Sequence, residues 1–317
     1  MTTLPPVPPT SSAPPRKWFR PAVGALNGRL LAMLGCLAMS FPAAGQAPPD
    51  AAIFLVHLRT RGQAVRVSKP INVTGRQGYN NQPAFTPDGK ALLYTSIRGD
   101  GQADTYRYDL RKQTTTQLTR TPESEYSPTV TPDGRHFSVV RVEKDQTQRL
   151  WQFSLAGAGE PTLLLKHVQP VGYHCWLDGD WLGLFILGEP NSLQLARVST
   201  GDTIRIEGNI GRSLQKVPGK NALSYVHKRT PTEWDIKLLD LQTRQTTVIT
   251  RTLEGSEDFV WTPDGALWMC RGAVLYRYRP GTDASWLPLA DLGAYGIGQL
   301  NRLALDAKGQ KLALVGQ

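Results

Sequence analysis

A Pro-Asp-Gly turn returns along this chain at a nearly constant spacing. Three copies are complete and three are degenerate, and they end at Gly89, Gly134, Gly179, Gly219, Gly265 and Gly309. The steps between these glycines are 45, 45, 40, 46 and 44 residues. A period of about 40–50 residues with β-type sequence between the turns is typical of a β-propeller. Proline fixes φ, aspartate bonds to nearby backbone and glycine accepts a positive φ, so each copy predicts a tight turn.

The segments that follow each turn have the composition of β-strands. Residues 90–96, 104–110 and 114–119 alternate in polarity and are rich in β-branched and aromatic side chains. We find no amphipathic helical pattern after residue 50. The repeating unit is therefore predicted to be a four-stranded antiparallel blade.

The two ends of the repeat region complement each other. Residues 53–58 resemble a third strand, residues 64–67 and 71–74 a fourth, and residues 311–315 a second. Joined, they form one complete blade, which closes the ring and leaves only short, protected edges. The sequence thus predicts an all-β, six-bladed β-propeller over residues 51–317. The N-terminal outer strands are expected to pair with the C-terminal inner strands.

Residues 1–46 read as a targeting leader. A Pro-rich start and a basic stretch precede an apolar core at residues 30–41, and small residues follow it. Cleavage after Gly45 or Ala47 would release the propeller, and we predict export to the periplasm or the cell exterior. The run could instead remain as an anchor, Cys36 could be acylated, or the start of the chain could be wrongly assigned. Membrane association is expected only through this leader or a lipid anchor.

The positive charge does not indicate nucleic-acid binding. Four of the ten formal positive charges come from residues 1–46, which contain four basic residues and no acidic one, so the remainder carries +6. Its basic residues are scattered, whereas tracking a phosphate backbone requires a cluster. No nucleic-acid partner is expected.

Two cysteines lie beyond the leader, Cys175 and Cys270. They fall in non-adjacent blades beside large apolar residues, and no CxxC or HxxxH spacing is present. We expect two small buried hydrophobic residues and no disulfide.

The turn and strand segments resemble the TolB-like family of WD40-like propeller repeats. The residues concerned are 79–90, with Gln82-Pro83-Ala84-Phe85-Thr86-Pro87-Asp88-Gly89, then 104–110, then Gln117-Leu118-Thr119. The resemblance covers about residues 51–317 and is strongest in the first, second and fifth blades. It implies a six-bladed propeller of an exported bacterial protein that binds envelope proteins. The family's separate N-terminal α/β domain has no counterpart here, so partner identity does not transfer. The same repeat forms the non-catalytic propeller of prolyl-oligopeptidase-type peptidases.

Loops that enter the innermost strands converge at one mouth of a propeller channel, where ligands bind. Aligning these entries gives a polar ring that carries both signs of charge. Its candidate ligand-binding residues are Asn81, Tyr126, Tyr173, His174, Arg212, Glu257, Asp258 and Arg302. We interpret the protein as a non-enzymatic binding or scaffold protein that uses this ring, without a cofactor or catalytic residue.

The alternative is a metal-assisted hydrolase or lactonase. A Ca²⁺ or Zn²⁺ ion would then be held by Asn81, Glu257 and Asp258, with His174 as general base. No catalytic sequence motif supports this alternative. The repeated aspartates are expected to be turn residues, and most tryptophans are expected to pack between blades.

Overall fold

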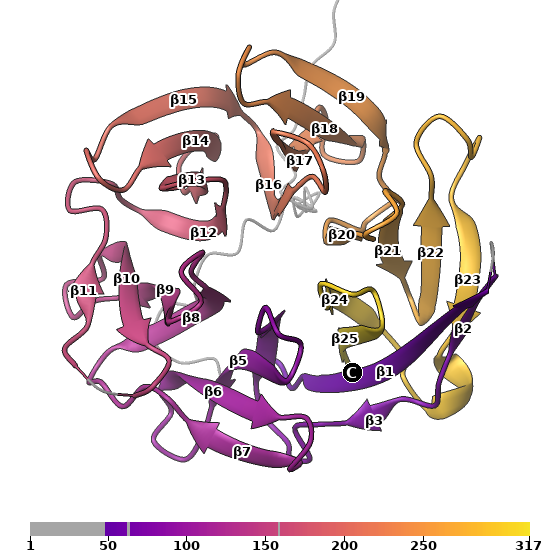
Figure 1. Cartoon of the computed structure of the whole chain (residues 1–317), viewed down its shortest axis with the longest axis horizontal. Coiled ribbons are helices and arrows are strands. Elements are labelled where there is room, and N and C mark those ends of the chain that lie inside the picture. The colour runs from indigo at the N-terminus through magenta and orange to yellow at the C-terminus, as the bar shows by residue number, and fades with distance from the viewer. Residues whose placement is uncertain (1–47, 62–63, 158) are drawn as a thin grey trace, which may run out of the picture. The chain divides into compact units, whose positions relative to one another are not determined.

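The computed structural model describes residues 48–61, 64–157 and 159–317. The predicted leader, including Cys36, lies outside these residues. The described residues form six antiparallel sheets arranged around a central axis, as Figure 1 shows. They contain no α-helix, only the short 3₁₀ turn η1 (Gly293–Tyr295). None of the described helices has the length and apolar character that a bilayer crossing requires.

The first five blades have four strands each, given from the centre outward in chain order. Blade A contains β4 (Asn80–Phe85), β5 (Ala91–Ile97), β6 (Ala103–Asp109) and β7 (Thr114–Gln117), and blade B contains β8 (Ser124–Val130), β9 (His136–Val142), β10 (Gln148–Ser154) and β11 (Thr162–Leu163). Blade C contains β12 (Val171–Trp176), β13 (Trp181–Ile186), β14 (Ser192–Arg197) and β15 (Thr203–Gly208). Blade D contains β16 (Ile210–Lys216), β17 (Ala222–Lys228), β18 (Trp234–Asp240) and β19 (Thr246–Arg251), and blade E contains β20 (Phe259–Trp261), β21 (Leu267–Arg271), β22 (Val274–Tyr278) and β23 (Leu287–Asp291).

Blade F joins the two ends of the described chain and confirms the predicted closure. Its inner strands are β24 (Leu300–Leu305) and β25 (Lys311–Gly316), and its outer strands are β1 (Ala52–Arg61), β2 (Ala64–Val67) and β3 (Ile71–Asn72). Ala52 pairs with Gly316 and His57 with Lys311. The fold class predicted from the sequence is therefore correct. The fourth strand consists of two segments, as predicted, although β3 ends at Asn72 and not at Thr74; β2 and β3 both pair with β1.

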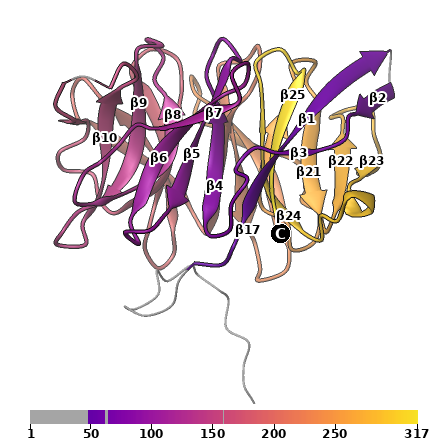
Figure 2. The same ribbon diagram turned by 90° about the horizontal axis from the view of Figure 1, so that it is seen from below.

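The outer half of β1 continues past the ring and forms a hairpin with β2, which Figure 2 shows projecting from one edge. Leu58, Val65 and Val67 of this hairpin pack with Leu289 and Ala290 of blade E in one apolar cluster. The hairpin thus fastens blade F to its neighbour in addition to the strand pairing within the blade.

The Pro-Asp-Gly turns have the predicted chemistry. The Thr86 hydroxyl donates to the Asp88 carboxylate at 2.7 Å, and the same carboxylate accepts the Lys90 backbone N–H at 3.0 Å. Gly89 has a φ of 64°, a left-handed conformation that glycine adopts without strain. Equivalent bonds join Thr131 to Asp133 and Thr262 to Asp264. These aspartates are occupied in turns and are not free for chemistry.

Candidate functional site

The innermost strands begin at one end of the ring, and the second strands finish there because neighbouring strands are antiparallel. Five of the six innermost strands contain a break in register next to this end. Gln82 and Ser127 have φ values of 56° and 55° at two of these breaks. Such bulges redirect neighbouring side chains, a device common beside binding sites. This end of the ring is the channel mouth.

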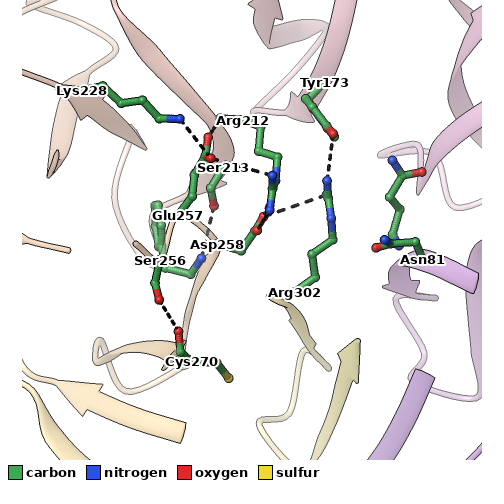
Figure 3. Close-up of polar contacts among 12 residues, drawn as sticks. Asn81, Tyr173, Arg212, Ser213, Lys228, Ser256, Glu257, Asp258, Cys270 and Arg302 are labelled. Atoms are coloured by element: carbon green, nitrogen blue, oxygen red, sulfur yellow. Dashed lines mark hydrogen bonds and ion pairs between the residues drawn. The ribbon is translucent and has the colours of Figure 1, made fainter. Parts of the chain in front are cut away.

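Arg212 is the centre of a charged network at the channel mouth, drawn in Figure 3. Its guanidinium pairs with the Asp258 carboxylate and lies 3.8 Å from that of Glu257. Its backbone N–H also donates to Glu257. Burial opposes the charge on Arg212, but Asp258 and Glu257 more than offset burial and raise the pKa of Arg212 above its ordinary value. Arg212 is therefore a fixed cation held by two carboxylates.

Arg302 extends this network across the channel. Its Nη2 donates to the Tyr173 hydroxyl at 2.8 Å, and its Nη1 lies 3.9 Å from an Asp258 oxygen. The guanidinium carbon also lies 5.1 Å from the centre of the Tyr173 ring, within cation–π range. Tyr173 belongs to blade C and Arg302 to blade F, on opposite sides of the ring in Figure 1. The hydrogen bond between Arg302 and Tyr173 therefore crosses the channel.

Lys228 supplies a third cation at the end of β17, where its ammonium lies 3.2 Å from Glu257. The network thus contains three cations and two carboxylates. Gly211 allows this packing, because a Cβ at that position would overlap a Glu257 carboxylate oxygen. Lys228 was missed in the sequence, and Gly211 was not chosen as a candidate although it begins the aligned entry to blade D. The end of each second strand would have pointed to Lys228, and a glycine within an innermost strand would have pointed to Gly211.

Tyr79 is a third residue near the channel mouth that was not selected from the sequence. Burial raises its pKa above the usual value, while Arg302 and Arg212 act in the opposite direction. Tyr173 and Tyr126 act on the same hydroxyl, which places three tyrosines near the two arginines. Burial likewise raises the pKa of Tyr126. The three tyrosines come from the entries to blades A, B and C, whereas the paired charges come from the entries to blades D, E and F.

Asn81 lies across from Arg302 in Figure 3, apart from the two carboxylates. Its side-chain oxygen accepts the Gln82 backbone N–H at 2.8 Å, a contact that stabilises the bulge in β4. The described contacts do not connect Asn81 to Glu257 or Asp258, the partners that the metal hypothesis requires. Among the described residues, no group of three histidine, cysteine or acidic side chains is arranged to hold a metal ion.

His174 is not part of the network, because alternation along β12 sends Tyr173 and His174 to opposite faces of the sheet. The Nε2 of the buried His174 ring is hydrogen-bonded to the Ser138 hydroxyl at 2.7 Å, and Ser138 accepts the Trp176 indole N–H at 2.8 Å. Burial lowers the pKa of His174 to about 3. The imidazole thus links blades B and C as a neutral group, and the geometry does not favour its role as a general base at the channel mouth.

Glu125, at the entry to blade B, is also turned away from the channel. Its carboxylate is fully buried, accepts the Thr121 hydroxyl and lies 3.6 Å from Arg141. Burial raises its pKa to about 7, with Asp104 adding to the rise and Arg141 opposing it. Glu125 therefore belongs to the contact between blades A and B.

Both cysteines outside the leader behave as small hydrophobic residues. Cys270 is buried and Cys175 is partly buried, and neither forms a disulfide within the part of the chain that is described. Burial raises the pKa of the Cys175 thiol to about 11, and that of Cys270 further. Neither thiol is activated as a nucleophile.

No protein-family model matches the chain. Among solved structures, a protein described as a TolB of Agrobacterium tumefaciens superimposes with a TM-score of 0.65 at 17% identity. The superposition covers 86% of this chain and 99% of that one. TolB of Acinetobacter baumannii gives a TM-score of 0.54 at 13% identity, over 84% of this chain and 64% of that one. The fold is a TolB-like six-bladed propeller. The resemblance noted in the turn and strand segments is thereby confirmed for the fold.

A gluconolactonase from Xanthomonas campestris has the same fold. It gives a TM-score of 0.59 at 12% identity, over 86% of this chain and 99% of that one. At this identity the likeness extends to the fold alone, and propellers carry many unrelated functions. The chemistry must therefore be argued from the channel mouth.

Proposed function

We propose that this protein is a binding or scaffold protein that recognises its ligand or protein partner at the channel mouth. The observation that carries this proposal is the network Tyr173–Arg302–Asp258–Arg212, which joins side chains from four blades. The four side chains of Arg212, Glu257, Asp258 and Arg302 are only 12–18% exposed, so their positions are fixed before anything binds. Preorganised polar groups of this kind favour recognition, because less order has to be imposed on binding.

The charge arrangement supports binding in preference to catalysis. A general base or a metal ligand needs a carboxylate with free lone pairs, whereas Asp258 and Glu257 each contact two cations. A divalent ion at this point would also face Arg212, Lys228 and Arg302. The excess of one positive charge favours an anionic or hydrogen-bond-accepting group on the ligand.

The sequence also supports a location for the protein outside the cytoplasmic membrane. The basic stretch and the apolar core at residues 30–41 support export, and the TolB-like fold is consistent with an envelope protein. Envelope proteins are accordingly the partner class that we propose.

The test is a crosslinking capture from bacterial envelope fractions, with the exported protein as bait. Wild type is compared with Arg302→Gln and Tyr173→Phe, and Lys220→Gln serves as the matched control because it removes an exposed charge in a distant turn. We expect one reproducible partner, lost with Arg302→Gln, weakened with Tyr173→Phe and retained with Lys220→Gln. Equal recovery by wild type and both channel variants would reject the channel mouth as the binding surface.

A second measurement addresses the hydrolase alternative. Gluconolactone hydrolysis is followed with and without Ca²⁺ and Zn²⁺, in wild type and in Asp258→Asn. We expect no metal-dependent rate above the uncatalysed one. Metal-dependent hydrolysis that Asp258→Asn abolishes would replace the binding proposal with the enzymatic one.

A further inference from the structure

A second polar site lies at the perimeter of the ring, away from the channel mouth. It is a groove of about 600 Å³ between the outer strands β6 and β7 of blade A and the turn after β10 of blade B. Sites for small ligands generally measure 300–1,000 Å³. The polar side chains that line it are Arg107, Asp109, Lys112, Thr114, Thr116, Gln117 and Arg120. The Gln117 side-chain oxygen accepts the Arg120 Nε–H at 3.4 Å.

The strand register explains how these groups come together. Arg107 pairs directly with Thr116, and Asp109 pairs with Thr114, so all four side chains lie on one face of the sheet. The turn between the strands adds Lys112, and the segment after β7 adds Arg120. Leu118, Leu155 and Ala156 give the groove an apolar portion.

The cations of this groove differ from those at the channel mouth, because none of them is held in a close ion pair, although Arg107 and Lys112 act electrostatically on Asp109. Arg107, Lys112 and Arg120 form no ion pair within 4.0 Å among the described residues. The Arg107 Nε is buried and makes no hydrogen bond within the same part of the chain. Because this Nε is enclosed, a ligand in the groove would bond to the terminal nitrogens of the Arg107 guanidinium.

Asp109 restricts what kind of anion can enter. One of its oxygens accepts the backbone N–H groups of Arg111 and Lys112 at 3.0 and 2.8 Å, which lower its pKa and keep it ionised. A carboxylate repels a polyanion but accepts hydrogen bonds from hydroxyl groups. The hydroxyls of Thr114 and Thr116 add donors and acceptors of the same kind.

We propose that this groove binds an acidic sugar, a ligand that combines a single carboxylate with several hydroxyl groups. The carboxylate is received by Arg107 and Arg120. The ligand hydroxyls bond to Asp109, Thr114 and Thr116, and the C–H face of the sugar ring packs on Leu118 and Leu155. The site is separate from the channel mouth and does not depend on the function proposed there.

Isothermal titration of the purified protein tests this assignment with glucuronate and galacturonate as probes. Glucose, galactose and acetate supply the hydroxyls or the carboxylate alone. We expect at least one uronate to bind, and its neutral parent sugar and acetate to bind at least tenfold more weakly. Arg107→Gln should weaken uronate binding at least tenfold, with Arg302→Gln leaving it unchanged.

Two further variants show whether a loss of uronate binding comes from the groove or from a folding defect. Lys112→Gln alters an exposed turn and should weaken uronate binding severalfold, whereas Lys220→Gln, an equal loss of charge in the blade D turn, should have no effect. Absence of uronate binding, equal binding of acetate, or equal effects of the two lysine variants would each overturn the assignment. Loss of uronate binding in Arg302→Gln would assign the sugar to the channel mouth instead.

Discussion

The acidic side chains of this propeller lie in two different electrostatic environments. Glu257 and Asp258 are paired with cations at the channel mouth, whereas Glu125 is fully buried between blades with a hydroxyl and one arginine beside it. Burial therefore dominates at Glu125 and favours its neutral form. The two environments lead to different responses to pH and to substitution.

The first prediction concerns pH. Burial in the folded protein raises the pKa of Glu125 from its ordinary 4.5 to about 7. Between these values the folded state binds the extra proton, so the free energy of unfolding falls as pH rises through this window. Glu125→Gln removes this loss. It should match wild type near pH 4.5 and exceed it by roughly 2–3 kcal/mol at pH 8. Urea unfolding of both proteins across this range gives the comparison, and a pH-independent difference would contradict the prediction.

The second prediction concerns the fit of Gly211 against Glu257. Gly211→Ala places a methyl group on the carboxylate and should lower the free energy of unfolding by roughly 2–3 kcal/mol. Glu257→Ser removes the obstructing oxygen, so in that background the alanine should be nearly neutral. A double-mutant cycle measures the coupling, which exceeds ~0.5 kcal/mol for residues in contact. Strict additivity would show that the contact is not what makes glycine necessary.

Whole elements are joined by a repeated link between a tryptophan on an innermost strand and a serine on the second strand of the preceding blade. Trp176 donates to Ser138 at 2.8 Å and Trp261 donates to Ser224 at 2.7 Å. The link confirms packing between blades for these two tryptophans. In blade B the same serine is also hydrogen-bonded to His174, so the two links differ by one hydrogen bond.

The third prediction uses this difference. Each serine hydroxyl also bonds to a backbone carbonyl, Thr129 for Ser138 and Gln215 for Ser224. Besides that bond, Ser138→Ala removes the partners of the Trp176 N–H and the His174 nitrogen, whereas Ser224→Ala removes the partner of the Trp261 N–H. The expected losses in the free energy of unfolding are roughly 2–4 kcal/mol and about 1–2 kcal/mol respectively. Guanidinium denaturation of the two variants provides a matched test. Equal losses would mean that His174 finds another partner.

The blades could be predicted from the sequence because the turn motif and the strand pattern recur along the chain. Each repeat therefore supports the same blade structure. The channel mouth could be predicted only in part, because it depends on what does not repeat. Arg212, Asp258 and Arg302 were found by aligning the entries to the innermost strands. His174 was misjudged because its direction depends on the register of β12, and Lys228 was missed because it comes from a different strand of its blade.

At the scale of the whole molecule, the ring is closed by contacts between the two ends of the described chain. Six residues of β1 pair with β25, and the Gln317 side chain donates to the Asp50 carbonyl at 2.9 Å. The arrangement predicts that the ends can be joined without distortion. Backbone cyclisation of residues 50–317 through a short Gly-Ser linker should stabilise the ring by roughly 3–5 kcal/mol, as expected for restricting a long unfolded chain.

The comparison for this fourth prediction is the linear chain with the same linker residues. Thermal unfolding should remain cooperative and shift to higher temperature in the cyclised protein. A lower transition temperature, or two separate transitions, would show that the closing blade is strained or only loosely paired.

The pairing of β1 with β25 also sets an order of events during biosynthesis. Asp50 and Gln317 are 267 residues apart, and a ribosome adds only ~5–20 residues per second. For tens of seconds, therefore, β1 lacks its inner neighbour β25, and Ile53 and Leu55 lack Ala313 and Val315 of their apolar cluster. A nascent chain in this state needs a chaperone or rapid passage through a secretion channel. Proteins of this design should consequently depend more on cellular folding factors than their finished stability would suggest.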